Sequence, residues 1–474
     1  MALPDVTITV SDGALGLAET SGNLHAKLGL SSGGTANTVY SFGDIAVAKA
    51  TLLAGPLLED VAFHLATAGG PVLAVPVTPS NAGTIGSVTL TGTGVTPGAS
   101  ATGTPRDKYD VVVKIIAGGA VATASFQVSF DGGVTFSPTT ATAASITTYV
   151  ASTGLTLTFA AGTYVANDLY KFSTVAPTYS SSDLNTAIDA LLADARDVAF
   201  IHVVGTTGGA DDAAKITSFV ALCTAVATKM ATAETAKRWE FAIMEAPEIT
   251  EGAWAASATW NAFASTRISP ALGRVTIQSQ VSSRQTTRSL GTPYAARLAS
   301  IPVQEHPGKA ARGPLPGIVS MSRDERSTPG GDAARFTTAR TFPRRHGYYL
   351  TNGRTAASAG SDFVKIMNRR VIDKACRSAD SALFQFLNVD LRVNADDGTI
   401  FEADARNIEA AVDAALTADL VATGNASSVS SVVNRSSNVL STETIPVTIR
   451  IVPKGYASFI TADVGLLNPA LQVV

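Results

Sequence analysis

The sequence predicts a multidomain α/β (α+β) protein with a mostly parallel sheet, an inserted all-β sandwich and a C-terminal α+β assembly domain with extended terminal arms. Three observations predict this organisation. Strand-like and helix-like segments alternate before residue 80 and again after residue 182, which is typical of βαβ units. The segment between them is rich in Thr, Gly, Ala and Ser and carries short alternating runs, which is typical of a β-sandwich. Residues 340–452 show the clearest periodicity in the chain.

The composition indicates the broad class of protein to which the chain belongs. A chain of 474 residues suggests about three domains, each able to bury its own core. Only 15% of residues are charged, and 35 basic against 38 acidic side chains give a net charge of -3. Such a chain has no overall field that attracts nucleic acid, and little repulsion keeps its copies apart, which favours self-association.

Targeting and cysteine signals are absent from the sequence. Cys223 and Cys376 each lie in a helical pattern, and we expect two buried thiols rather than a disulfide or a zinc site. The first residues lack a basic region followed by an apolar stretch, and no apolar run is long enough to span a membrane. We therefore expect a protein that is made and kept in the cytosol, without membrane insertion.

Residues 1–34 are expected to form an N-terminal arm. Val6, Ile8 and Val10 alternate with polar residues as in a half-buried strand, and a polar, glycine-rich segment follows from Ser11 to Gly34. A strand this near the terminus can pair locally or reach the sheet edge of a neighbouring molecule, and both alternatives stay open.

Residues 35–79 and 183–300 are expected to form one interrupted α/β domain. Pro56 suits the first turn of a helix, and Gly69 and Gly70 end that helix because glycine accepts left-handed dihedral angles. The pattern predicts helices at 56–68, 183–195, 210–233 and 254–265, and strands at 39–42, 72–77, 198–204, 239–244 and 274–277.

Residues 80–182 are expected to form the inserted, outward-facing β-sandwich. Alternating runs lie at 88–91, 109–116, 125–130, 155–159 and 169–172, with turn residues between them. Asp131, Gly132 and Gly133 predict a hairpin, since adjacent positions with positive φ suit glycine.

The chain then becomes irregular from residue 278 to 342, and residues 301–342 are expected to form a connector. Five prolines block long regular elements there: Pro302, Pro307, Pro314, Pro316 and Pro329. A segment this long is expected to be held against other parts or other subunits. Its end and the following residues carry a basic cluster, comprising Arg335, Arg340, Arg344, Arg345 and His346, with Arg354 beyond. The cluster can bind phosphate, but without interleaved aromatic residues we favour contact with an acidic protein surface.

Residues 343–474 are expected to form a C-terminal polymerisation domain and arm. A short strand at 348–350 precedes a helix at 362–387 with five basic and three acidic residues. A second helix at 401–420 carries five acidic residues against Arg406, so it presents a charged face to solvent or to a basic partner. The alternating residues Ile445, Val447, Ile449 and Ile451 predict a closing strand, which can pair with a neighbour's sheet.

No motif supports catalysis, a cofactor or a metal ion. The five histidines (His25, His64, His202, His306 and His346) lack metal-ligand spacing. Gly205 to Gly209 follow a strand and precede a helix, but they lack the lysine of a P-loop and the G-x-G-x-x-G spacing, so a plain loop is favoured over a phosphate site. A calcium loop at Asp396–Gly398 is excluded, because Val393 and Ala395 would occupy ligand positions.

The order of these parts resembles the contractile tail sheath proteins of myophages and of related phage-tail-like injection systems. The resemblance covers nearly the whole chain. Its strongest motifs are Gly347-Tyr-Tyr-Leu-Thr-Asn-Gly-Arg-Thr before the basic helix, Asn368-Arg-Arg-Val-Ile within that helix, and residues 445–456 with a Pro-x-Gly-Tyr turn. The family's glycine-rich phrase before the strand is only approximated by Thr338-Ala-Arg-Thr-Phe, and the β insertion varies within the family.

The resemblance implies a structural, non-enzymatic virion subunit that needs no cofactor and is assembled in the cytoplasm of a bacterial host. It implies stacked hexameric rings around a tail tube, with baseplate and tail terminator proteins as further partners and no direct nucleic-acid contact. Contraction would drive the tube through the target envelope. The inter-subunit arms would be Val6, Ile8, Val10, Ile445, Val447, Ile449 and Ile451, and the tube-facing candidates Glu402, Arg406, Glu409 and Asp413.

Two alternatives remain at this point. One is a virion surface or adhesion protein whose β domain binds host glycans. The other is an α/β enzyme that uses the loop at Gly205.

Overall fold

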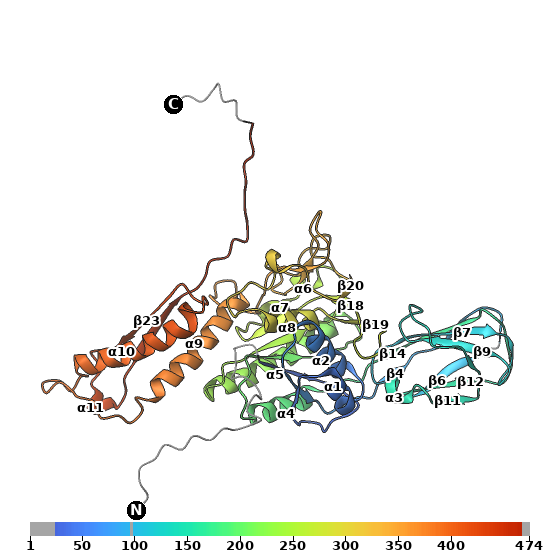
Figure 1. Cartoon of the computed structure of the whole chain (residues 1–474), viewed down its shortest axis with the longest axis horizontal. Helices are drawn as coiled ribbons and strands as arrows, with labels where there is room; N and C mark the ends of the chain where they lie inside the picture. The colour runs from blue at the N-terminus through green and yellow to red at the C-terminus, as the bar shows by residue number, and fades with distance from the viewer. Residues whose placement is uncertain (1–23, 95–97, 467–474) are drawn as a thin grey trace, which may run out of the picture. The chain divides into compact units, whose positions relative to one another are not determined.

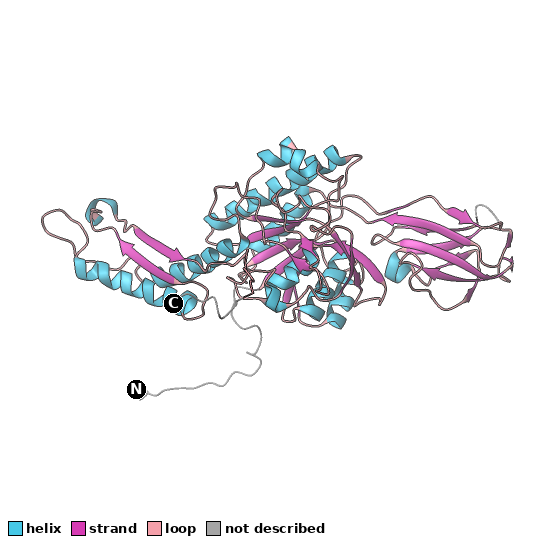
Figure 2. Cartoon of the chain, turned by 90° about the horizontal axis from the view of Figure 1, so that it is seen from above, coloured by secondary structure: helices cyan, strands magenta, loops and turns pink. Residues whose placement is uncertain are grey.

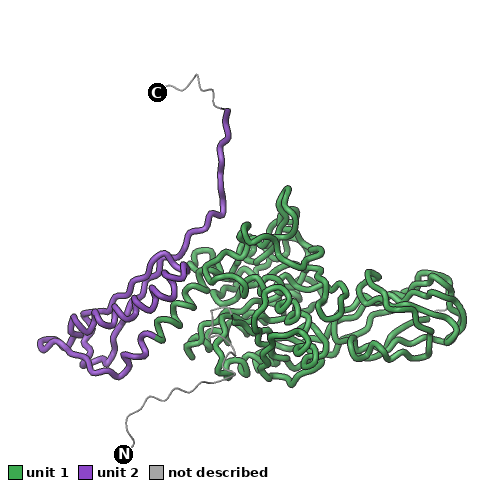
Figure 3. Tube along the Cα trace, in the orientation of Figure 1, with its two compact units in different colours: residues 1–381 green, residues 382–474 purple. Residues whose placement is uncertain are grey.

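The computed structural model describes residues 24–94 and 98–466, and the chain divides into two compact units (Figures 1 and 3). Unit 1 is Met1–Ser381 and unit 2 is Ala382–Val474. Val6, Ile8 and Val10 lie outside the described residues.

A six-stranded sheet forms the centre of unit 1, in the order β17-β16-β15-β1-β3-β2. All neighbouring strands are parallel except β2, which is antiparallel to β3. The predicted α/β class with a parallel sheet is therefore confirmed. The strands are β1 (His25–Gly29), β2 (Tyr40–Phe42), β3 (Val72–Pro76), β15 (Phe200–Val203), β16 (Phe241–Glu245) and β17 (Ile268–Ala271).

The strand β1 corrects the prediction of a polar arm that extends to Gly34. Residues 25–29 lie between β3 and β15 in the middle of the sheet and are fully buried. The prediction of an arm was wrong because both faces of β1 are buried, with His25 and Lys27 on one face and Ala26 and Leu28 on the other. A lysine is expected at the surface unless the acidic side chain that pairs with it in the core is known.

Helices cover both faces of this sheet, as a parallel sheet requires. On the face of Ala26 and Leu28 pack α4 (Ser181–Leu192) and α5 (Asp212–Thr235). On the opposite face pack α2 (Pro56–Thr67) and α8 (Gly291–Ser300), and α1 (Ile45–Leu52) packs against α2.

The helix α5 is the only one among the described residues that is long and apolar enough to cross a membrane. One of its faces is buried in the core of the sheet domain, through Ile216, Phe219, Leu222, Cys223, Val226 and Met230. The packing is that of a core helix in a globular domain.

The chain after residue 250 is more regular than the sequence suggested. The single helix expected at 254–265 is two short ones, α6 (Ala253–Ala256) and α7 (Ala258–Ala262). The segment from residue 278, expected to be irregular, contains α8 and most of a three-stranded antiparallel sheet in the order β19-β18-β20. Its strands are β18 (Arg274–Gln278), β19 (Gln285–Ser289) and β20 (Ile318–Met321). A 3₁₀ turn, η1 (Ala310–Arg312), lies between α8 and β20.

The segment between β3 and α4 forms its own antiparallel sheets around one core, shown as layered strands in Figure 2. One sheet has the order β10-β9-β7-β14-β4, with β5 also paired to β14, and another has the order β11-β12-β6. Gly132 and Gly133 have positive φ as predicted, but Asp131 begins a loop rather than a tight hairpin, because the partner strand starts only at Thr140.

The elements of this β region are short. They are β4 (Thr84–Ile85), β5 (Thr89–Thr91), β6 (Ala99–Gly103), β7 (Asp110–Ala117), β8 (Gly119–Ala120), β9 (Ser125–Ser129), β10 (Thr140–Ala141), β11 (Ser145–Ile146), α3 (Val150–Thr153), β12 (Leu155–Phe159), β13 (Thr163–Tyr164) and β14 (Leu169–Val175).

The boundary between the units falls inside α9 (Ile366–Phe384), whereas the sequence suggested a domain beginning at residue 343. The first part of α9 belongs to unit 1 because its arginines form hydrogen bonds and ion pairs with residues of that unit. Arg370 is buried and donates to the carbonyl oxygens of Leu298 and Ile301, and Arg267 and Arg369 both pair with Asp373. These buried arginines leave this helix with fewer charges for exchangeable contacts than its sequence suggested.

Unit 2 holds the end of α9, the helix α10 (Glu402–Leu416) and a two-stranded antiparallel sheet of β23 (Ser428–Val433) and β24 (Val447–Val452). A π-helical turn, η2 (Thr417–Val421), extends α10, and a short helix, α11 (Val439–Thr442), lies between the strands. The strand β23 was not predicted, because serines occupy half of its positions.

Candidate assembly surface

Most acidic side chains of α10 form ion pairs within unit 2. Arg435 lies between Glu402 and Glu409, with its Nε 3.0 Å from Glu402 Oε2 and its Nη2 2.9 Å from Glu409 Oε2. Arg406 donates to Glu402 from the next turn of the helix, at 2.6 Å. Hydrogen bonds from Arg435 and Arg406 hold the pKa of Glu402 at about 2, and Arg435 also lowers the pKa of Glu409.

Glu409 additionally connects the helix to the sheet, because its Oε1 accepts a hydrogen bond from the backbone N–H of Val433 at 2.7 Å. The apolar stripe of α10, formed by Ile408, Val412 and Leu416, is buried beneath it. Asp413 differs from the other candidates, since among the described residues it makes no ion pair. Of the four side chains assigned to a tube contact, Asp413 is thus the one without an ion pair, and it is half-buried with its Oδ1 turned away from solvent.

The two-stranded sheet of unit 2 is incomplete. Val447, Ile449 and Ile451 pair in register with Val433, Ser431 and Val429 and face the same side as these residues, yet they remain half-exposed. Ile445 precedes the strand and is half-buried. Within the described residues each strand has one unpaired edge. Such edges and half-covered apolar residues are what a further strand would cover.

The chain after β24 is extended and apolar. Residues 453–466 contain no helix or strand, and Figure 3 shows this stretch lying away from the rest of unit 2. Phe459, Ile460, Val464 and Leu466 are each more than four-fifths exposed. Four large apolar side chains without cover between residues 459 and 466 are unusual on an isolated protein and indicate a surface that is buried by a partner.

A second polar cluster lies buried in unit 1, at the centre of the parallel sheet. Lys27 Nζ of β1 lies 3.2 Å from both carboxylate oxygens of Asp60 on α2. His202 of β15 lies between two acids, with its Nδ1 2.9 Å from Asp60 Oδ2 and its Nε2 3.1 Å from Glu245 Oε1. The second oxygen of Glu245 accepts the backbone N–H of Gly205 at 2.9 Å.

Protonation of His202 would balance the charges of this cluster. Burial opposes a charged imidazole, but the adjacent Asp60 and Glu245 outweigh that cost and raise the pKa of His202. With His202 protonated, two cations face two carboxylates. Burial lowers the pKa of Lys27 but its carboxylate partner opposes this effect.

Asp60, His202 and Glu245 also bring possible metal-ligand atoms within 4.8 Å of one another. A metal ion fits this cluster poorly, because both ring nitrogens of His202 already face carboxylates and Lys27 supplies the positive charge that a metal would add. We interpret the cluster as a structural ion network. Spacing in the sequence gave no sign of it, since the members come from four separate elements.

The loop after Gly205 lies at the switch point of the sheet, where β1 and β15 lead to opposite sides. A cavity of about 610 Å³ opens there, lined by Leu30, Thr206, Thr207, Lys108 and Arg288 among others. Two of its polar groups are committed, because Gly205 N–H donates to Glu245 and Arg288 pairs with Asp107. These pairings commit two donors of the crevice, whereas Thr207 Oγ1 has no hydrogen-bond partner among the described residues.

The fold is that of contractile tail sheath proteins. The chain is similar to a chain of the anti-feeding prophage baseplate in its contracted state, with a TM-score of 0.57, 12% identity, and coverage of 98% of this chain and 99% of that one. It is also similar to the anti-feeding prophage helical sheath in the contracted state (TM-score 0.54, 11% identity, 98% and 99% covered). A third similar structure is the PVC sheath complex of an extracellular contractile injection system in the contracted state (TM-score 0.51, 11% identity, 100% and 99% covered).

The chain belongs to the DUF2586 family. Its residues 3–354 match the N-terminal domain of that family and residues 362–471 match the C-terminal domain. A comparison with curated proteins finds no match. The resemblance predicted from the sequence is confirmed at the level of the fold.

Proposed function

We propose that this chain is the structural subunit of a contractile sheath. Copies polymerise as stacked hexameric rings around a tube, and contraction drives the tube through the envelope of a target cell. The observation that carries this proposal is the incomplete β sheet of unit 2 together with its uncovered, apolar C-terminal segment. Both are features of a chain whose folding is completed by neighbouring copies.

In this assembly the two end segments of one copy add strands to the β23–β24 sheet of another. Main-chain hydrogen bonds of an added strand tolerate rigid-body movement of the domains that they link, so the connection persists while the packing of the subunits changes. Val6, Ile8 and Val10 at one end and the segment after β24 at the other are the donors, and the exposed edges of β23 and β24 are the acceptors.

Several features support a role in assembly rather than in chemistry. The members of the buried ion network in the sheet pair with one another, and at the crevice Gly205 N–H and Arg288 are paired as well. We propose a tube protein, a baseplate and a tail terminator as partners, and a particle that is either a phage virion or a tail-derived injection device. Two of the similar structures are sheath assemblies and a third is a baseplate of such a particle.

Negative-stain electron microscopy of the purified full chain tests the proposal. We expect striated tubes or rings. Two truncated variants, one lacking residues 1–13 and one lacking residues 453–474, are expected to remain folded monomers. Tubes of normal length from either variant would refute the role of that end, and a full chain that stays monomeric at high concentration would refute the sheath function.

The tube contact is tested at Asp413, because reversal of Glu409 would also break the contacts of Glu409 with Arg435 and Val433. Asp413→Lys should weaken co-sedimentation with the tube protein of the same particle. Asp419→Lys, at an exposed position on the following turn, is the matched control. Equal co-sedimentation of both variants and the unchanged chain would refute the assignment of α10 to the tube.

A further inference from the structure

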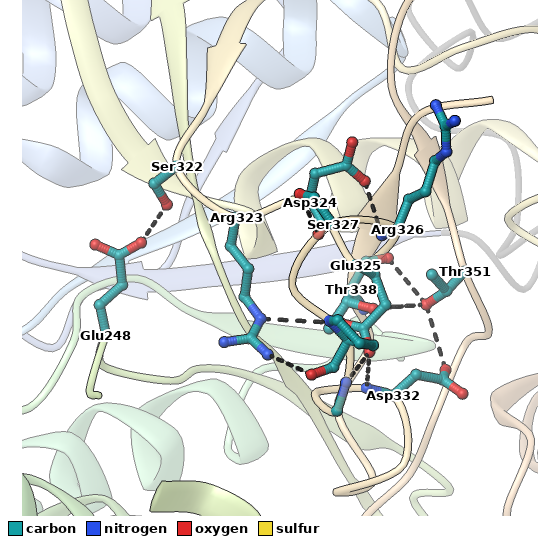
Figure 4. A network of polar contacts seen from close by, with 12 residues as sticks. Glu248, Ser322, Arg323, Asp324, Glu325, Arg326, Ser327, Asp332, Thr338 and Thr351 are labelled. Atoms are coloured by element: carbon teal, nitrogen blue, oxygen red, sulfur yellow. Dashed lines mark hydrogen bonds and ion pairs between the residues drawn. The ribbon is translucent and has the colours of Figure 1, made fainter. Parts of the chain in front are cut away.

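A short hairpin in unit 1 carries a concentrated positive charge on a fixed scaffold. It consists of β21 (Ala339–Arg340) and β22 (Tyr349–Leu350), and the residues flanking its strands are held together. Thr351 donates its backbone N–H to Thr338 O at 2.9 Å, and Asp332 accepts from the Thr351 hydroxyl, as Figure 4 shows. These contacts hold the base of the hairpin against the rest of unit 1.

The loop of the hairpin is also held at its base. Asp324 accepts the backbone N–H of Thr341 at 3.0 Å, and Leu315 donates to Tyr348 O at 2.8 Å. The ring of Phe342 packs between its neighbours, with the Arg340 guanidinium carbon 4.4 Å from its centre and the Tyr349 ring 5.3 Å away, edge to face. A preorganised loop loses little conformational entropy when it binds a partner.

We define the basic tip as residues 342–346. Arg344, Arg345 and His346 are exposed, and within the described part of unit 1 none of them makes an ion pair. Many other arginines of the unit do, including Arg196, Arg238, Arg267 and Arg288. The tip therefore leaves its positive charges uncompensated around a partly exposed aromatic ring, 37% exposed at Phe342.

Unit 2 carries the complementary surface. We define the acidic end as Asp396, Asp397 and Glu443 with Leu440. The loop before α10 and the helix α11 are joined there, because Asn438 Nδ2 donates to Asp397 O at 2.6 Å and Val439 N–H donates to Gly398 O at 3.0 Å. Figure 1 labels α11 at this end of unit 2. The three acids are exposed and unpaired with any cation of the described residues of unit 2, and Leu440 is 71% exposed.

The overall charges of the two units match this local pattern. Residues 382–474 contain ten acidic and five basic side chains, a net charge of -5, which leaves 28 acidic and 30 basic side chains in unit 1, a net charge of +2. Both surfaces place an exposed apolar side chain among charges of one sign. A central apolar anchor with a charged rim is the usual composition of a specific protein interface.

We propose that the basic tip of one copy docks on the acidic end of unit 2 in a second copy. The contact rests on the proposed sheath function, in which every subunit presents both surfaces. It joins two different surfaces, so it is heterologous and propagates along the assembly instead of closing a dimer. Exposed charges contribute modest energies singly, and repetition along a polymer makes their sum large enough to select one packing of the subunits.

A second copy suits the tip better than nucleic acid does. Arg340 covers one face of the Phe342 ring, which reduces its area for stacking on a base, and His346 is the one other ring in the tip. Every copy of the chain carries one basic tip and one acidic end, so the acidic end is available as a partner for each tip.

Two charge-reversal variants test the contact. The first, Arg344→Glu/Arg345→Glu, makes the tip acidic, and the second, Asp396→Arg/Glu443→Arg, makes the acidic end basic. All four side chains are exposed, and within the part of the chain that the structure describes none of them makes an ion pair. We expect each variant alone to need about tenfold more protein to assemble, because like charges now face each other at each contact. A mixture of the two variants should assemble as the unchanged chain does.

The mixture distinguishes a contact between copies from one within a chain. A chain carrying all four substitutions restores either kind of contact, but only a contact between copies is restored by mixing. Lys108→Glu/Lys171→Glu, at two exposed positions in unit 1, is the matched control and should assemble normally. Thermal unfolding of each variant confirms that the monomer is intact.

Sedimentation velocity at low salt keeps the two proposals separate. If the mixed variants associate while neither does alone, the contact stands even where the full chain forms no tubes, a result that would refute only the sheath function. Normal assembly of both single-surface variants, or no recovery on mixing, would refute the contact. Binding of a labelled DNA duplex that is lost in Arg344→Glu/Arg345→Glu would assign the tip to phosphate instead.

Discussion

Replacement of Lys27 by methionine tests the buried ion network at the centre of the sheet. Methionine has a similar length and no charge, so the main change is the loss of the Lys27 cation that faces the Asp60 carboxylate. Lys27, Asp60 and His202 are all fully buried, so water cannot compensate for the missing charge. The Asp60 carboxylate is then left with His202 as its one cationic partner in the cluster.

The expected cost follows from the geometry. Two unit charges 3.2 Å apart attract each other by about 5 kcal/mol at an effective dielectric constant of about 20. Removal of one partner from a buried pair typically costs about 3–5 kcal/mol, since the remaining charge stays desolvated. We therefore expect Lys27→Met to lower the free energy of unfolding of unit 1 by about 3–5 kcal/mol. The neighbouring His64 is a poor replacement for the cation, because burial, the largest cause of its lowered pKa, also acts in the variant.

Urea unfolding followed by tryptophan fluorescence is the suitable assay. All three tryptophans, Trp239, Trp254 and Trp260, lie in the sheet domain of unit 1, so the signal reports on that domain and not on unit 2. The variant Lys27→Met/Asp60→Leu removes the pair together and should recover most of the lost stability. A cost below about 1 kcal/mol for Lys27→Met, or a double variant whose loss equals the sum of the two single losses, would refute the network.

Three further predictions concern other parts of the chain. Arg435→Gln should speed amide hydrogen exchange in β23 and β24 at neutral pH, since Arg435 pairs with Glu402 and Glu409; exchange that matches the unchanged chain would contradict this. Glu240→Gln should be more stable than the unchanged chain at pH 8 but similar below pH 5, as measured by urea midpoints. Burial raises the pKa of Glu240 from 4.5 to about 7, so the folded state holds this proton more tightly than the unfolded state and stability falls as pH rises through this interval. Trp260→Phe should cost about 1–3 kcal/mol more than Trp254→Phe, because Trp260 Nε1 donates to Ala334 O at 2.7 Å while Trp254 Nε1 has no partner among the described residues; equal urea midpoints would argue against it.

The sequence predicted regular elements well where their periodicity was complete. The helix α2 begins at Pro56 and ends just before Gly69 as expected, because proline and glycine act through local dihedral angles. The strands β12 and β14 alternate buried and exposed side chains as their sequences do. Serine-rich β23 shows the limit of the same reasoning, since its partner strand and α10 make it a strand.

The candidate site was predicted in part. The sequence indicated an acidic helix followed by an alternating strand, and the structure contains both. It could not indicate that Arg435 would neutralise Glu402 and Glu409, because this arginine is 26 residues from Glu409 in the chain. Charge counted along a helix therefore overstated the charge that is free for a partner.

The α/β class, the β insertion and the resemblance to sheath proteins could be predicted from the chain, because these depend on periodicity and composition within short segments. Three features became visible in the folded chain alone: His25–Gly29 is a central strand, the arginines of α9 belong to unit 1, and Asp413 has no ion pair among the described residues. Each of these depends on which distant residue becomes a partner for a buried charge. Solvation makes such partners necessary, but only the fold brings them together.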